Sequence, residues 1–176
     1  MLRVSRHCLI TGMASFAILG SAALAQDKYS LRVPEGIAFS EFRGYESWHL
    51  VSLSHSDETL NVIVANPVMI KAYEAGILGK GKPWPDGAKM VKIQYIPKRS
   101  TEAPFNVSVP GALKDVAFMA KDAKRFSDSG GWGYALFNYN VKSKSFAPEG
   151  KGHNCGFACH TAVKAKDYVF TEYGQR

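Results

Sequence analysis

The chain of 176 residues is 46% hydrophobic, 12% aromatic and 21% charged, with a formal net charge of +7. These values fit a single globular domain that buries a substantial core, and the chain is too short for two ordinary domains. The lysines are scattered and form no run, which argues against nucleic acid or a membrane surface as a partner and leaves an acidic redox protein open.

The first 25 residues have the pattern of a secretory signal peptide. A basic start without acidic residues precedes a mostly apolar run of small residues over 8–22, and Ala23-Leu24-Ala25 matches a signal-peptidase site. The apolar run is short for a membrane anchor, which remains the alternative. We therefore expect cleavage after Ala25, one mature domain over residues 26–176 and a periplasmic location. Cleavage would remove two arginines and one cysteine, leaving a net charge of +5 and two cysteines.

The mature sequence alternates between strand-like and turn-forming stretches. Alternating apolar residues predict strands over residues 48–54, 60–65, 88–96, 116–120 and 132–139. Asn66 as the N-cap and Pro67 at the first helical position predict a short helix that ends at Gly76. Residues 98–111 are predicted to be a long connection, because prolines interrupt them.

A motif near the C-terminus, His-Asn-Cys-Gly-Phe-Ala-Cys-His over residues 153–160, places two cysteines before a histidine. This arrangement attaches a c-type haem, in which the thiols form thioethers and the imidazole ligates the iron. Three residues separate the cysteines here, instead of the usual two. Cysteines four apart on a helix remain on one face, roughly 40° and about 6 Å apart, and both can reach one haem edge. We therefore predict a haem helix over residues 156–166, with Cys155 and Cys159 as thioether residues and His160 as the axial iron ligand.

Two other interpretations of the cysteines stay open. A disulfide between Cys155 and Cys159 in a haem-free domain suits an oxidising compartment, but it requires the segment to be non-helical. A zinc site requires four ligands, and the mature chain has no further cysteine.

The remaining residues favour an iron with one protein ligand and an open sixth position, which would bind small molecules. No methionine follows His160, and the methionines and other histidines of the mature chain fit core, strand or loop positions. These residues are Met69, Met90, Met119, His49, His55 and His153. The many alternating stretches exclude a helical bundle. We expect an α+β fold with a mostly antiparallel β-sheet, a few short helices and a C-terminal haem-attachment helix.

A set of motifs in order along the chain resembles the cytochrome P-460 family over most of the mature sequence. It comprises Trp48, residues 72–74 (Ala-Tyr-Glu), 85–87 (Pro-Asp-Gly), Lys92, residues 130–133 (Gly-Gly-Trp-Gly), Cys159-His160 and residues 165–171 (Ala-Lys-Asp-Tyr-Val-Phe-Thr). The resemblance implies a periplasmic, homodimeric monohaem c-type cytochrome that oxidises hydroxylamine or nitric oxide and passes electrons to a periplasmic acceptor. A related branch, the β-type cytochromes c′, implies instead the binding of gases such as NO or CO without turnover.

The resemblance also implies that a lysine is bonded to the porphyrin edge in catalytic members. Lys92 is the best match and Lys89 the alternative, although a solvated or ion-paired Lys92 suits the pattern equally well. A hydroxylamine oxidase also needs a base near the iron. The carboxylates available for this role are Asp115, Asp122, Glu74 and Glu102. A gas-binding site would use aromatic side chains, for which Phe39, Phe42, Phe118 and Phe137 are candidates.

Overall fold

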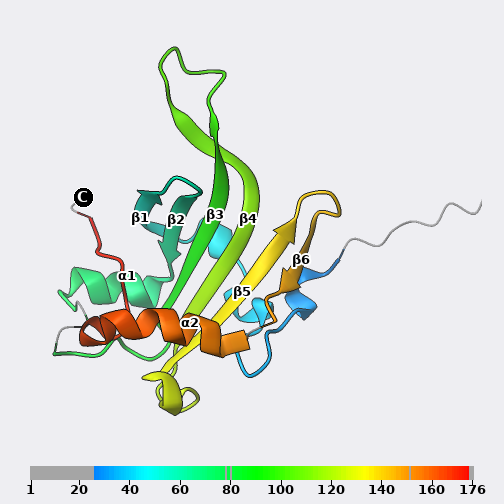
Figure 1. Cartoon of the computed structure of the whole chain (residues 1–176). Helices are drawn as coiled ribbons and strands as arrows, with labels where there is room; N and C mark the ends of the chain where they lie inside the picture. The colour runs from blue at the N-terminus through cyan, green and yellow to red at the C-terminus, as the bar shows by residue number, and fades with distance from the viewer. Residues whose placement is uncertain (1–25, 78, 80, 151, 175–176) are drawn as a thin grey trace, which may run out of the picture.

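The computed structural model describes residues 26–77, 79, 81–150 and 152–174, and the predicted signal peptide lies outside these residues. Its main element is one sheet of six strands in the order β1 to β6, each antiparallel to the next (Figure 1). The strands are β1 (His49–His55), β2 (Leu60–Ala65), β3 (Lys89–Arg99), β4 (Ser108–Lys121), β5 (Trp132–Asn140) and β6 (Ser145–Pro148). This sheet with its few short helices confirms the predicted α+β fold.

Two α-helices and several 3₁₀ turns complete the described fold. The helices are α1 (Pro67–Glu74) and α2 (Gly152–His160). The side chain of Asn66 caps α1 by accepting a hydrogen bond from the backbone N–H of Met69 at 3.1 Å. The predicted haem helix begins earlier than expected, at Gly152, and changes to a 3₁₀ turn over Thr161–Lys166. None of the helices in the described part of the chain has the length and apolarity needed to cross a membrane.

The sheet separates two layers of buried side chains. One face carries Val91, Val116 and Phe137, which pack against the N-terminal segment through Phe39 and Phe42. On the other face, α1, α2 and the C-terminal segment cover one end of the strands, and α2 crosses them (Figure 1). Beyond α2 this second face is less covered, and it is here that the candidate site lies.

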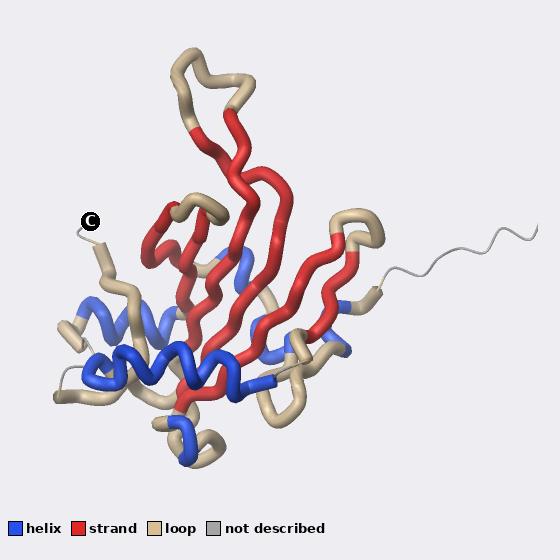
Figure 2. Tube along the Cα trace, in the orientation of Figure 1, coloured by secondary structure: helices blue, strands red, loops and turns tan. Residues whose placement is uncertain are grey.

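The longest strands extend past the sheet as a two-stranded hairpin, which the sequence did not predict (Figure 2). β3 continues to Arg99 and β4 begins at Ser108, so both ends of the predicted connection are strand and residues 100–107 form the loop between them. Pro97 lies opposite Pro110 in this extension. Proline interrupts a sheet because it lacks an N–H, but the outer edges of the hairpin have no neighbouring strand, and proline is therefore tolerated there.

Candidate haem site

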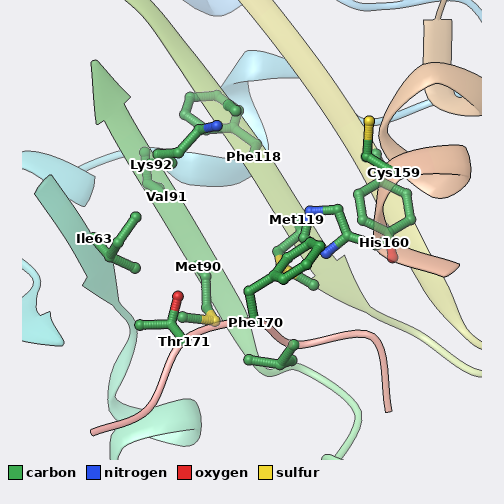
Figure 3. Close-up of a pocket in the computed structure, with 13 residues that line it drawn as sticks. Ile63, Met90, Val91, Lys92, Phe118, Met119, Cys159, His160, Phe170 and Thr171 are labelled. Carbon is green, nitrogen blue, oxygen red and sulfur yellow. The ribbon is translucent and has the colours of Figure 1, made fainter. Parts of the chain in front are cut away.

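A cavity of about 210 Å³ lies between the second face of the sheet, α2 and residues 169–171 (Figure 3). Its wall is mainly apolar and includes side chains of Ile63, Met90, Ala117 and Met119. The remaining lining residues include Lys92, Cys159 and His160. The structure thus brings two of the predicted haem-binding residues and the predicted crosslinking lysine to one cavity.

Strand register arranges the side chains of this face in three rows. The row nearest His160 contains Met90, Met119 and Tyr134, and the middle row contains Ile63, Lys92, Ala117 and Leu136. The third row is polar and consists of Asn61, Gln94, Asp115 and Asn138. Rows on one face are about 6.7 Å apart, because every second residue of a strand faces the same side. The site therefore changes from apolar to polar with distance from His160.

His160 is the last residue of α2, and two aromatic rings hold its imidazole. The ring centroids of Tyr134 and Phe170 each lie 4.9 Å from that of His160. The His160 Nδ1 atom is 2.6 Å from the carbonyl oxygen of Tyr168. Burial lowers the pKa of His160, although the hydrogen bond to Tyr168 opposes this and Lys92 adds to it. The neutral imidazole therefore carries its proton on Nδ1 and keeps the Nε2 lone pair for a metal.

Cys155 and Cys159 are exposed and unpaired on α2. Because the segment is a regular helix, the structure does not support the disulfide, which needs non-helical backbone. A zinc site also lacks support, since no group of three or more candidate ligands occurs among the described residues. Two free thiols on one helix face and a neutral imidazole beside an apolar cavity are the donor set that a covalently attached haem requires.

Gly156, between the two cysteines, brings α2 close to the sheet. A Cβ atom at this position would lie 2.5 Å from the Cβ atom of Tyr134 on β5, a separation that side chains do not tolerate. The glycine therefore allows the helix to pack directly over Tyr134, which places His160 at the cavity.

The two candidate lysines lie on opposite faces of the sheet. Lys92 is exposed and lines the cavity together with His160. Lys89 lies on the other face, where its Nζ atom donates to the carbonyl oxygen of Glu41 at 2.7 Å and lies 5.3 Å from the ring centroid of Phe42. Lys92 is therefore the only one of the two that lines the cavity, and its bond to the porphyrin stays a prediction.

Asp115 is the candidate base that lies on the cavity side of the sheet. It is only 4% exposed, and its Oδ1 atom is buried without a hydrogen-bond partner among the described residues. Burial raises the pKa of its carboxyl group, and the positive charges of Lys92 and Lys114 partly oppose this. Asp115 lies in the row next to Lys92 and Ala117 but does not itself line the cavity. The other candidates lie farther from it in the fold: Asp122 caps a turn, Glu74 ends α1 and Glu102 lies in the β3–β4 loop.

The aromatic candidates lie mainly on the face of the sheet that the N-terminal segment covers. We call this the closed face, and the face with the cavity the open face. Phe39, Phe42 and Phe137 lie in the core opposite the cavity, and Phe118 contributes to the cavity wall while its ring stacks on that of Phe42 at 4.2 Å. Phe170, 49% exposed, instead lies at the cavity against His160. From the sequence, Phe170 was named only within the family pattern and was not placed at the site.

Among the described residues, the methionines and the histidines other than His160 lie on the sheet and the two helices, and two of the methionines also line the cavity. Met90 and Met119 are buried in the row nearest His160, and Met69 is buried in α1. His153, on α2, packs its ring against Phe126, Tyr134 and Phe157. The other two histidines lie on β1.

An antiparallel sheet, a histidine and a free thiol at an apolar cavity, and a second free thiol one helical turn earlier on α2 define a cytochrome-like haem site. The family model described as Cytochrome P460 matches residues 42–171. The chain therefore belongs to the cytochrome P460 family, and this membership implies a haem cofactor. No curated protein matches the chain significantly.

Proposed function

We propose that this protein is an exported monohaem c-type cytochrome that oxidises hydroxylamine or nitric oxide and passes the electrons to a periplasmic acceptor. In this proposal Cys155 and Cys159 hold one haem through thioethers, and His160 is the axial ligand. The bound haem supplies an iron centre with an open position for a small nitrogen compound and accepts its electrons. The family and the donor set support this assignment.

The buried carboxylate of Asp115 is the observation that favours an oxidase over a protein that only binds gases. Oxidation of hydroxylamine removes N–H and O–H protons with the electrons. Oxidation of nitric oxide to nitrite takes one oxygen atom from water, gives one electron to the acceptor and releases two protons. A base on the polar row beyond Lys92 can accept them. Gln94 and Asn138, which flank Asp115 across the strands, provide amide groups that can orient a polar substrate.

The test compares Asp115→Asn with Asp57→Asn in the haem-loaded protein, with hydroxylamine as substrate and a soluble dye as electron acceptor. Asp57 is exposed in the β1–β2 turn and is a matched control. We expect Asp115→Asn to lower kcat by about 10²- to 10⁴-fold, the usual effect of losing a general base, while the control and the haem spectrum stay unchanged. Equal activity of the two variants would contradict the assigned role of Asp115.

A gas-binding protein is the second candidate, because much of the cavity wall is apolar and suits a diatomic gas. Wild-type protein that takes up nitric oxide or carbon monoxide in the reduced state, yet oxidises neither hydroxylamine nor nitric oxide, would establish this function instead. The same preparations test the Lys92 bond: a peptide that joins Lys92 to haem in the wild type should be absent from Lys92→Gln.

Export and dimer formation are parts of the same proposal. Mature protein beginning at Gln26 is expected in the periplasmic fraction, and N-terminal sequencing checks it. A homodimer agrees with the exposure of large apolar side chains such as Leu53 at 61% and Phe105 at 73%. Sedimentation of the purified protein should give twice the mass of the mature chain with its haem.

A further inference from the structure

The hydrogen-bond acceptor of His160 lies in a segment with unusual backbone geometry. Asp167 and Tyr168 follow one another with φ of 46° and 65°, so two consecutive residues with side chains occupy the left-handed region. This conformation is unfavourable for residues other than glycine, and it persists only where the surroundings hold it in place. It places the Tyr168 carbonyl oxygen 2.6 Å from His160 Nδ1.

A buried ion pair holds this segment. The carboxylate of Asp167 accepts hydrogen bonds from Lys121 Nζ at 2.9 and 2.8 Å, and its Oδ2 atom also accepts one from the backbone N–H of Trp84 at 2.8 Å. The side chains of Lys121 and Asp167 are only 5% and 13% exposed. The end of β4 and the loop before β3 are thus both tied to the residue that precedes Tyr168.

The ammonium of Lys121 is anchored independently of Asp167. Its Nζ atom donates to the carbonyl oxygen of Gly130 at 2.9 Å and lies 5.1 Å from the ring centroid of Trp132. Gly130 also makes room for the Tyr168 ring, because a Cβ atom at Gly130 would lie 2.1 Å from a ring carbon of that tyrosine. The turn at Gly130 therefore holds both Lys121 and the ring of Tyr168, whose carbonyl oxygen accepts the hydrogen bond from His160.

We infer that Lys121 and Asp167 are positioning residues for the axial histidine, and this inference rests on the proposed ligation of haem iron by His160. The pair fixes the Tyr168 carbonyl, and the hydrogen bond from Nδ1–H to that oxygen sets both the orientation and the basicity of the imidazole. A stronger hydrogen bond makes the imidazole a better donor, which favours oxidised iron. Buried ion pairs are weak sources of stability, so a positioning role also accounts for the presence of two costly buried charges.

The test removes both charges at once with Lys121→Met/Asp167→Asn, because one buried charge without its partner destabilises a fold strongly. The haem-loaded protein is measured for its iron–histidine stretching frequency in the reduced state, its midpoint potential and its thermal unfolding. We expect a lower stretching frequency and a more positive potential than in the wild type. Asp167→Asn alone leaves the Lys121 ammonium bonded to the Gly130 carbonyl, keeps an oxygen that can accept from Trp84 and tolerates the left-handed conformation, so it should shift both values in the same direction by less.

Glu41→Gln is the matched control, since it breaks a second ion pair, in which Arg125 Nη1 lies 2.8 Å from Glu41 Oε2, without touching the His160 segment. This variant should lower the unfolding temperature and leave frequency and potential unchanged. If the charge-free double variant does not accumulate with haem, Asp167→Asn alone decides the question. If Asp167→Asn lowers the unfolding temperature but leaves the iron–histidine stretching frequency and the midpoint potential unchanged, the inference is overturned. Wild-type protein without a haem spectrum would instead contradict the proposed function, before any variant is compared.

Discussion

The two faces of the sheet use the same strands for different purposes. Val91, Val116 and Phe137 are completely buried on one face and form the core with the N-terminal segment. Their immediate neighbours Lys92 and Asp115 lie on the opposite face, in the rows that lead away from His160. Because side chains alternate along a strand, one residue separates a core position from a site position. The closed face thus provides a rigid base that fixes the spacing of groups on the open face.

The largest expected effect comes from breaking the closed face. Phe118 stacks on Phe42 and lies edge-to-face with Phe39. Phe118→Ala should lower the free energy of unfolding by about 3–5 kcal/mol, because it removes a large buried ring and leaves a cavity. Urea unfolding of the haem-loaded protein measures this loss. Glu58→Ala, at an exposed position in the β1–β2 turn, should change it by less than about 0.5 kcal/mol.

Moving α2 away from the open face should cost less stability than Phe118→Ala, but it should affect the haem site more. Gly156→Ala forces a methyl group against Tyr134, and overpacking of this kind costs about 1–3 kcal/mol. Since α2 carries both cysteines and His160, we also expect a lower ratio of haem to protein, measured by absorbance. Gly150→Ala adds the same methyl group in open space and should preserve loading. Equal loading of the two variants would show that the approach of α2 to β5 does not position the motif.

The smallest expected effect is a gain in stability when the charge of Asp115, on the open face, is removed. Asp115→Asn should stabilise the protein by about 1 kcal/mol at neutral pH, because it removes the charge of a buried carboxylate whose Oδ1 atom has no hydrogen-bond partner among the described residues. The folded-state pKa of Asp115 is raised, so the wild type loses stability as the pH rises from about 4 through that pKa. The gain in the variant should therefore be present at pH 7 and absent near pH 3.5, as measured by urea unfolding. A gain that is equal at both pH values would contradict a raised pKa.

Local patterns in the sequence predicted most of the elements and the motif residues of the site. The cap at Asn66 and the alternation in β3 depend on near neighbours, and both agree with the structure. The predicted strand over 116–120 began one residue too late to include Asp115, because prolines marked the preceding segment as a loop. Register then placed Asp115 between Gln94 and Asn138, which no local pattern reveals.

The contacts that hold the His160 ring could not be predicted from the sequence either. Its acceptor is a backbone oxygen, and the ion pair behind it joins residues 46 positions apart. A backbone carbonyl carries no sequence signal, and Lys121 stood among many scattered lysines. The run from Asp167 to Phe170 was noticed only as part of a family pattern, whereas the structure gives its members separate physical roles.

The most direct test of the whole account is the intact mass of the protein recovered from the periplasm of a host that matures c-type cytochromes. The account predicts the mass of residues 26–176 plus one covalently bound haem, with both Cys155 and Cys159 blocked to thiol reagents. A colourless protein whose mass is lower by two hydrogens, as a Cys155–Cys159 disulfide requires, would contradict it.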